Sequence, residues 1–265
     1  MPIWSRNIGI ISLKQMEFLS TKRIAILGCG LGSLVAESAV RFGFRHLLIA
    51  DGDTVEETNL NRTVYRNRDI GRPKAEALAA HLMSICPDID VTMHNHYIRH
   101  EEVSAIVSSC DLVIDTIDLS AIDIIVAAHR EARKQGKSSL FPLNMGYGSG
   151  LMVFDPSSAT LEECLGFSID TETETFANLY ANKEIFQSWL QMIVPHLNTY
   201  QLQLLESFLG QIEENGWCPL PQSGIAGQIS AVMCVTAAIR VLLGLPVIMA
   251  PSMMTVDLWD IMSHE

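Results

Sequence analysis

Three glycines, at positions 28, 30 and 32, mark a candidate phosphate-binding turn. An apolar run over residues 23–27 precedes them, and a helical pattern begins at Leu31. The backbone N–H groups of such a turn, together with the partial positive charge of a helix N-terminus, can bind phosphate. We therefore expect Gly28, Gly30 and Gly32 to contact the phosphates of a nucleotide.

An acid follows the next apolar run along the chain. Asp51 comes directly after residues 46–50, where a carboxylate can accept hydrogen bonds from ribose hydroxyls. These features alone would suit NAD, FAD or ATP. Ser33 stands where the dinucleotide pattern G-x-G-x-x-G needs its third glycine, which weighs against a dinucleotide. An NAD-dependent oxidoreductase is the alternative from another functional class.

A basic segment between Asn61 and Lys74 stands out in an otherwise acidic chain. Five cations there face a single acid, Asp69, although the whole chain carries a net charge of -12. A triphosphate that must lose pyrophosphate needs its charge held in the transition state. The segment therefore indicates phosphate chemistry. Its cations are Arg62, Arg66, Arg68, Arg72 and Lys74.

These motifs occur in an order and spacing that resemble the ThiF/MoeB/HesA family of E1-like adenylyltransferases. The resemblance covers roughly residues 5–154 and 221–258. It rests on Gly28-Cys29-Gly30-Leu31-Gly32, Asp51-Gly52-Asp53-Thr54-Val55-Glu56, Asn59-Leu60-Asn61-Arg62, Asp69-Ile70-Gly71-Arg72-Pro73-Lys74 and Asp115-Thr116-Ile117-Asp118.

The resemblance implies roles for the residues that contact ATP. It places Asp51 at the ribose, with Asp53 nearby and Asn59 beside the nucleotide. Lys74 resembles the phosphate-binding lysine of the family. Asp118 resembles the acid that meets Mg²⁺.

The resemblance also implies a homodimer. Arg62 resembles an arginine finger that reaches into the partner's site, and Arg6 is expected to be a second contact in trans. The catalytic residues would then be Arg62, Lys74 and Asp118.

The reaction itself needs no general base. A substrate carboxylate, already ionised at neutral pH, attacks the α-phosphorus in line while pyrophosphate leaves, so positioning and charge neutralisation suffice. No convincing His-Asp-Ser arrangement is evident in the sequence. Asp115 is expected to end its strand as a structural residue.

The chain departs from many relatives in its cysteines. Six cysteines contain no C-x-x-C pair, so no zinc site is expected. Cys164 and Cys218 lie where a thioester cysteine could sit, but incidental thiols are favoured. Many relatives bind zinc through C-x-x-C pairs. The absence of these pairs weakens the alternative function, activation of a ubiquitin-like sulfur-carrier protein.

Three histidines raise the question of another metal site. His94 and His96 would lie on one strand face near His100, but no clear carboxylate partner is evident, so a surface strand end is favoured.

The coarse pattern predicts an α/β fold. We expect a Rossmann-like, doubly wound, mostly parallel sheet with an inserted helical lobe. Residues 1–155 would form the nucleotide-binding adenylation core, 156–220 the lobe, and 221–265 the return to the sheet. The lobe could pack on the sheet or on the second subunit, or form a substrate-recognition groove.

Composition excludes several classes. The net charge of -12 opposes binding to nucleic acid or to an anionic membrane. The most apolar stretch, residues 225–250, is interrupted by Gln228, Arg240, Gly244 and Pro246, which favours a buried helix over a membrane span. Reduced thiols and the lack of a signal peptide favour a cytoplasmic protein.

Together these features predict an ATP-dependent adenylyltransferase. It would activate a carboxylate of a peptide or small protein as an acyl adenylate, which a nucleophile then captures in a dehydration or cyclisation. Phe154-Asp155-Pro156, a helical lobe and then Pro221-Gln222-Ser223-Gly224 are similar to zinc-less family members that modify peptides, as in pantocin-type antibiotic maturation.

Overall fold

Five short strands form the parallel part of a seven-stranded sheet. The computed structural model describes the chain except residues 1, 182–183, 216–220 and 264–265. The strand order is β3-β2-β1-β4-β5-β6-β7. Strands β1 to β5 pair in parallel, which confirms the predicted fold class. They are β1 (Arg23–Leu27), β2 (His46–Ala50), β3 (Asp90–His94), β4 (Leu112–Asp115) and β5 (Ser138–Met145).

Two further strands complete the other edge of the sheet. β6 (Gly148–Phe154) runs antiparallel to β5 after a tight turn, and β7 (Met254–Asp257) runs antiparallel to β6. The last strand of the chain therefore returns to the sheet.

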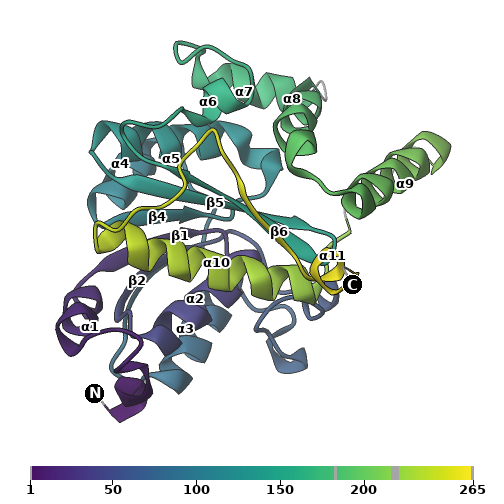
Figure 1. Cartoon of the computed structure of the whole chain (residues 1–265). Coiled ribbons are helices and arrows are strands. Elements are labelled where there is room, and N and C mark those ends of the chain that lie inside the picture. Colours follow the sequence, from purple (N-terminus) through teal and green to yellow (C-terminus); the bar gives the residue numbers. More distant parts are fainter. Residues whose placement is uncertain (1, 182–183, 216–220, 264–265) are drawn as a thin grey trace.

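Helices cover both faces of the sheet, because the central strands are apolar on both sides (Figure 1). Ile24 and Ile26 pack with α2 (Leu31–Phe42), α3 (Lys74–Ile85) and α10 (Gly224–Leu242) on one face. The alternate residues Ala25 and Leu27 pack with α4 (His100–Ser108) and α5 (Ile122–Lys134) on the other. This alternation fixes the register of β1.

Before β1, a 3-10 helix η1 (Pro2–Asn7) and α1 (Leu13–Ser20) pack at one end of the molecule. The indole of Trp4 donates to the carbonyl of Val40 at 2.8 Å, and Asn7 donates to that of Phe42 at 2.8 Å. η1 is thus fixed at the C-terminal end of α2.

A helical segment is inserted between β6 and α10. Its first three helices pack on α5 and on β5 and β6, around buried Phe176 and Ile185. The last helix projects from the body of the molecule (Figure 1). The helices are α6 (Leu161–Cys164), α7 (Thr173–Ala181), α8 (Glu184–Ile193), η5 (Val194–His196) and α9 (Thr199–Asn215).

An aromatic stack anchors the projecting helix. Tyr200 of α9 packs against both Tyr147 of the β5–β6 turn and Trp259 of α11 (Leu258–Ser263), with ring centroids 6.0 and 5.6 Å away, and these two rings stack on each other at 5.1 Å. Offset stacking of this kind stabilises beyond the apolar area that it buries.

Among the described residues, one helix is long and apolar enough to cross a membrane, namely α10. Half of the apolar window is buried, and the helix packs on α2 and on β5 and β6. The prediction of a buried core helix agrees with this packing.

Candidate active site

A cavity of about 500 Å³ opens at the carboxyl ends of the parallel strands. The chain runs outward in opposite directions from β1 and β4, and the loops that follow these two strands line the cavity. Ligands of open α/β sheets bind at such a switch point. Three short 3-10 helices lie in the surrounding loops: η2 (Glu57–Asn59), η3 (Asn67–Asp69) and η4 (Leu119–Ala121).

The glycine turn forms the floor of this pocket. Gly28 has a φ of +91°, and a Cβ there would lie 2.3 Å from the carbonyl oxygen of Thr116. Gly30 precedes α2 as its N-cap, and nothing lies within 4 Å of the place a Cβ would take. Both line the pocket, so the N-terminus of α2 can approach a phosphate.

Gly32 lies two residues after Gly30, the N-cap of α2. It lies inside α2, where a Cβ would come within 2.6 Å of both Ile26 and the Thr116 hydroxyl. It is not among the residues that line the pocket. The missing side chain therefore allows α2 to pack closely on the sheet. A contact of the Gly32 backbone with phosphate stays a prediction.

Asp51 organises the loops on either side of the pocket. Its carboxylate accepts hydrogen bonds from the backbone N–H groups of Cys29 at 2.6 Å and Asp53 at 2.7 Å. Burial raises the pKa of Asp51, and the two backbone donors only partly offset this effect. Asp51 lines the pocket, where its remaining lone pairs can accept further hydrogen bonds.

Lys74 and Asp53 form an ion pair within the pocket. The ammonium group lies 2.7 Å from the Asp53 carboxylate, and the Lys74 side chain is only 11% exposed. The Tyr97 hydroxyl donates to the other Asp53 oxygen at 2.5 Å. Burial raises the pKa of Asp53, but the Lys74 and Tyr97 hydrogen bonds outweigh it and lower the pKa overall.

Arg62 lines the pocket of its own chain. Its guanidinium donates to the carbonyl of Thr58 at 2.6 Å and to the side chain of Asn61 at 2.8 Å. Burial lowers the pKa of Arg62, partly offset by the charge of Glu56. Arg62 therefore needs no second copy to reach a nucleotide, and a role in trans stays a prediction.

Asn59 is buried beside Arg62 and also lines the pocket. Its side-chain oxygen accepts from the backbone N–H of Glu56 at 3.0 Å, which closes the η2 turn. The expected place beside the nucleotide is compatible with this position.

Asp118 lies on the opposite side, after β4. It is exposed, lines the pocket, and accepts the backbone N–H of Ser120 at 2.9 Å through one oxygen. Its other oxygen has no hydrogen-bond partner among the described residues. Carboxylate oxygens are the ligands that Mg²⁺ prefers, so Asp118 fits the magnesium role expected from the sequence.

Arg6 lies elsewhere in its own chain. It is exposed on η1, at the end of α2 opposite to the glycine turn, and it does not line the pocket. Any contact of Arg6 with a nucleotide would have to be with that of a second copy.

The rest of the basic segment does not enter the pocket. Arg72 pairs with Asp69 and Glu76 at 3.0 Å each, while Arg66 and Arg68 are exposed. Among the described lining residues, Arg62 and Lys74 are the cations, against the four carboxylates of Asp51, Asp53, Asp115 and Asp118. A bound triphosphate would thus need further positive charge.

The inserted helices reach the same cavity. Phe186 and Trp189 of α8 line it and stack on each other with centroids 5.9 Å apart. Because Ile185 and Met192 of this helix are buried in the core, α8 both packs on the core and lines the cavity. A role of the lobe in substrate recognition stays a prediction.

Among the described cysteines, two near the expected sites have thiols of raised pKa. Burial raises the pKa of Cys164 to about 11, with a further contribution from Glu163 and Glu162. Burial also raises the pKa of Cys29, which lies in the glycine turn. Cys218 lies outside the described residues.

A buried Asp-His-Ser chain is present, contrary to the expectation from the sequence. Nε2 of His129 lies 3.0 Å from Asp115, and Nδ1 lies 2.9 Å from the Ser139 hydroxyl. All three residues are buried. Asp115 ends β4 as expected, and its other oxygen accepts the backbone N–H of Ile117 at 3.0 Å.

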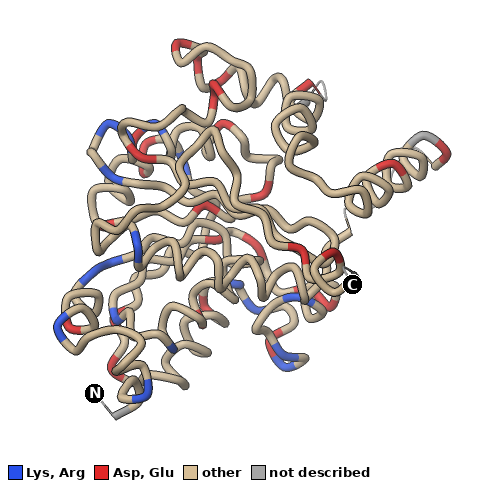
Figure 2. The backbone as a smooth tube through the Cα atoms, viewed as in Figure 1, with Lys and Arg blue, Asp and Glu red and all other residues tan. Residues whose placement is uncertain are grey.

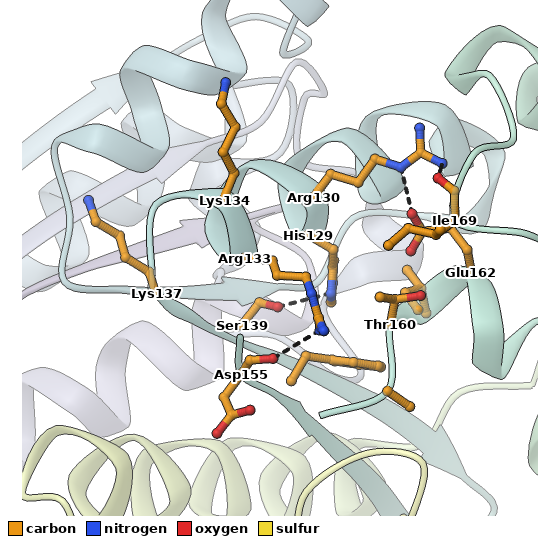
Figure 3. A pocket seen from close by; sticks show the side chains of 13 residues that line it. His129, Arg130, Arg133, Lys134, Lys137, Ser139, Asp155, Thr160, Glu162 and Ile169 are labelled. Atoms are coloured by element: carbon orange, nitrogen blue, oxygen red, sulfur yellow. Dashed lines mark hydrogen bonds and ion pairs between the residues drawn. The ribbon is translucent and has the colours of Figure 1, made fainter. Parts of the chain in front are cut away.

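His129 and Ser139 also line a second cavity, of about 380 Å³, beneath α5 (Figure 3). Arg133 crosses it and donates to the carbonyls of Asp155 and Ser158 at 3.2 and 2.8 Å. Arg130 pairs with the buried carboxylate of Glu162. These cations therefore tie the segment after β6 to α5.

The fold and site now permit comparison with known proteins. The ThiF family profile matches residues 4–265. The chain belongs to the ThiF family. The resemblance to these E1-like, ATP-dependent adenylyltransferases that was found in the sequence is thereby confirmed.

Two curated relatives each match part of the chain. Ubiquitin-like modifier-activating enzyme 5 of Caenorhabditis elegans is 35% identical over 91 residues, which cover 34% of this chain and 21% of that protein. The SAMP-activating enzyme E1 of Haloferax volcanii is 32% identical over 105 residues, 39% of each chain. The matches thus span well under half of either relative.

Solved structures share the fold of this ThiF-family chain. PaaA superposes with a TM-score of 0.65 at 16% identity, covering 93% of this chain and 64% of PaaA. The tRNA N6-threonylcarbamoyladenosine dehydratase TcdA of E. coli superposes with a TM-score of 0.63 at 16% identity, covering 92% of this chain and 95% of TcdA. MccB of E. coli with ATP superposes with a TM-score of 0.60 at 16% identity, covering 86% of this chain and 58% of MccB.

Sequence reasoning missed several residues of the site. Tyr97 is 70% exposed and follows no recognised motif, yet it binds Asp53 and lines the pocket. No motif marks Phe186 or Trp189 in the sequence of the inserted segment. Their proximity to the glycine turn depends on the packing of the inserted helices, which no local pattern reveals.

Proposed function

We propose that this chain is an ATP-dependent adenylyltransferase that activates a carboxylate of a peptide or small protein as an acyl adenylate. The observation that carries the proposal is that Lys74 and Arg62 enter one pocket with the Gly28–Gly30 turn, at the switch point of the sheet. The adenylate would then be captured by a nucleophile in a dehydration or cyclisation.

Lys74 and Arg62 would act on the phosphates. Lys74 pairs with Asp53, and a phosphate oxygen would replace or share this partner. Arg62 is fixed by the Thr58 carbonyl, which leaves other N–H groups of its guanidinium for a phosphate. Both cations would stabilise the charge that develops as pyrophosphate leaves.

Asp118 would hold Mg²⁺ through its unpaired oxygen. When bound, the ion would neutralise phosphate charge that two cations cannot balance. The shortage of positive charge in the pocket supports both this ion and a contribution from Arg6 of a second copy in a homodimer.

The charge of the inserted segment favours a peptide substrate with basic side chains. Residues 156–220 contain nine Asp and Glu against one Lys, a net charge of -8 out of -12 for the whole chain. In Figure 2 the described part of this segment shows red positions and no blue ones. Such a surface attracts a cationic partner and steers its approach.

Peptide maturation is also supported by one structural neighbour. MccB is a microcin C7 biosynthetic enzyme, and one of its structures holds N-formylated MccA. The Phe186–Trp189 stack beside the pocket could receive an apolar side chain of such a peptide. We place this chemistry in the cytoplasm.

Activation of a ubiquitin-like or sulfur-carrier protein is the second candidate. It is favoured by the two curated relatives, which are 35% and 32% identical over 91 and 105 residues. Membership of the ThiF family removes the support for an NAD-dependent oxidoreductase.

ATP–pyrophosphate exchange tests the proposal directly. Peptides with a free carboxylate flanked by Lys or Arg should stimulate exchange, and raising the salt concentration should weaken the effect. A protein with a Gly-Gly tail serves as the comparison. Stimulation by the Gly-Gly tail alone would favour the second candidate, and absence of exchange with both would contradict adenylation.

A further inference from the structure

The end of β3 places two imidazoles near each other. His94 is the last residue of the strand, and His96 follows two positions later, with ring centroids 5.5 Å apart. Alternate residues of an extended chain point to the same side. Nitrogen atoms of the two rings can therefore approach one ion together.

Glu102 adds the carboxylate that the sequence did not reveal. It lies in the first turn of α4, and Oε1 is 2.9 Å from Nε2 of His96. One ligand atom from each of His94, His96 and Glu102 lies within 4.8 Å of the other two. Two imidazoles and a carboxylate suit Zn²⁺, Co²⁺ or Ni²⁺, whereas Mg²⁺ prefers oxygen ligands alone.

Arg99 currently occupies the carboxylate. Its Nε and Nη2 atoms lie 3.1 and 2.9 Å from the two oxygens of Glu102. The Arg99 side chain is 63% exposed, so it can turn into solvent at little cost. The guanidinium thus competes for the ligand that a metal ion would take.

We propose that His94, His96 and Glu102 bind a divalent transition-metal ion of the zinc type beside the nucleotide pocket. The backbone links this site to the pocket. The carbonyl of His94 accepts the backbone N–H of Asp51 at 3.1 Å, and Tyr97, next to His96, donates to Asp53. A bound ion would fix the segment that carries Tyr97.

Titration of the full chain with Co²⁺, after treatment with a chelator, tests this site by visible absorbance. His94→Ala and His96→Ala should each weaken binding by about tenfold or more. His100→Ala is the matched control, because its imidazole instead binds Asp123 at 2.9 Å, and it should bind like the wild type. Arg99→Ala should bind several-fold more tightly because it frees Glu102.

Three outcomes would overturn the proposal. The first is binding of Co²⁺ by the double variant His94→Ala, His96→Ala that is as tight as binding by the wild type. A thiolate-to-cobalt charge-transfer band would assign the ion to cysteines. Unchanged or weaker binding by Arg99→Ala would remove Glu102 from the ligand set. Equal thermal unfolding of all metal-free variants excludes misfolding, and His94→Gln and His96→Gln replace any alanine variant that does not fold.

Discussion

The ammonium group of Lys74 lies 2.7 Å from a carboxylate oxygen of Asp53, at the place where a triphosphate would enter the pocket. Lys74 begins α3, and its backbone N–H donates to the carbonyl of Asp53 at 2.9 Å, so the two residues are joined twice. Contacts within the chain therefore hold the lysine in this position.

Replacement of Lys74 should affect turnover and leave the fold intact. Lys74→Ala removes a cation that would stabilise the leaving pyrophosphate, so we expect exchange to fall about a hundredfold or more. Arg68→Ala is the control, because Arg68 belongs to the same basic segment but is exposed and does not line the pocket. Equal activity of the two variants would contradict the role of Lys74.

The Lys74–Asp53 pair should stabilise the fold in a pH-dependent way. The pKa of Asp53 is lower in the folded protein than in the unfolded chain, so its contribution is complete above about pH 4 and is lost as pH falls through the folded value. Thermal melts of wild type and Asp53→Asn between about pH 7 and about pH 3 should show a difference in Tm that shrinks below about pH 4. A constant difference would argue against this ion pair.

Mixing inactive variants distinguishes contacts in cis from contacts in trans. Arg62 and Lys74 lie in the pocket of the same chain, so Arg62→Ala and Lys74→Ala should not complement each other. Arg6→Ala and Lys74→Ala should complement, because a hybrid dimer would contain one intact site.

An equal mixture of Arg6→Ala and Lys74→Ala should recover about a quarter of wild-type exchange. Rescue of Arg62→Ala by Lys74→Ala would instead establish an arginine finger in trans. No rescue by either mixture would count against a role of Arg6 in the partner's site.

The glycine turn offers a matched pair of substitutions. Gly28→Ala forces a side chain into a φ of +91° and against the Thr116 carbonyl, so it should destabilise the fold by about 2 kcal/mol or more. The added Cβ of Gly30→Ala would have no atom within 4 Å, so this variant should unfold like the wild type. It should still weaken ATP binding, because the new methyl group would take space that a phosphate needs beside the turn. Melting curves and ATP titration separate the two effects.

Cys164 should be dispensable for catalysis. With a pKa of about 11, its thiol is almost entirely protonated at neutral pH, so it is a poor nucleophile for an acyl adenylate. Cys164→Ala should keep product formation within about twofold of wild type. Peptide mapping after alkylation should show modification of Cys164 that accelerates as pH rises. A stable thioester at this residue would refute the expectation.

The sequence predicted the parts of the fold that depend on local patterns. Apolar runs identified the parallel strands, and the spacing of Gly28, Asp51 and Lys74 identified residues that meet in one pocket. Local patterns could not predict contacts between segments that are distant in the sequence. Asp115, His129 and Ser139 come from a strand end, a helix and a neighbouring strand, so only the packed sheet brings them together.

Gly32 shows a second limit of prediction from sequence patterns. A glycine in a phosphate-binding pattern serves equally well for phosphate contact and for close helix packing, and only the three-dimensional neighbours distinguish the two. The carboxylate partner of His96 was missed for a similar reason, because Glu102 lies on the following helix.

The end of the inserted segment is attached to the arginine loop. Asn61 donates to the carbonyl of Gln222 at 3.0 Å, and a Cβ on Gly224 would lie 2.5 Å from the Asn61 carbonyl. A chimera that replaces residues 156–220 with a segment of another protein must therefore preserve these contacts of Asn61 with Gln222 and Gly224. Otherwise the new segment would displace Arg62 from the pocket. An inactive chimera would then not report on the substrate specificity of the new segment.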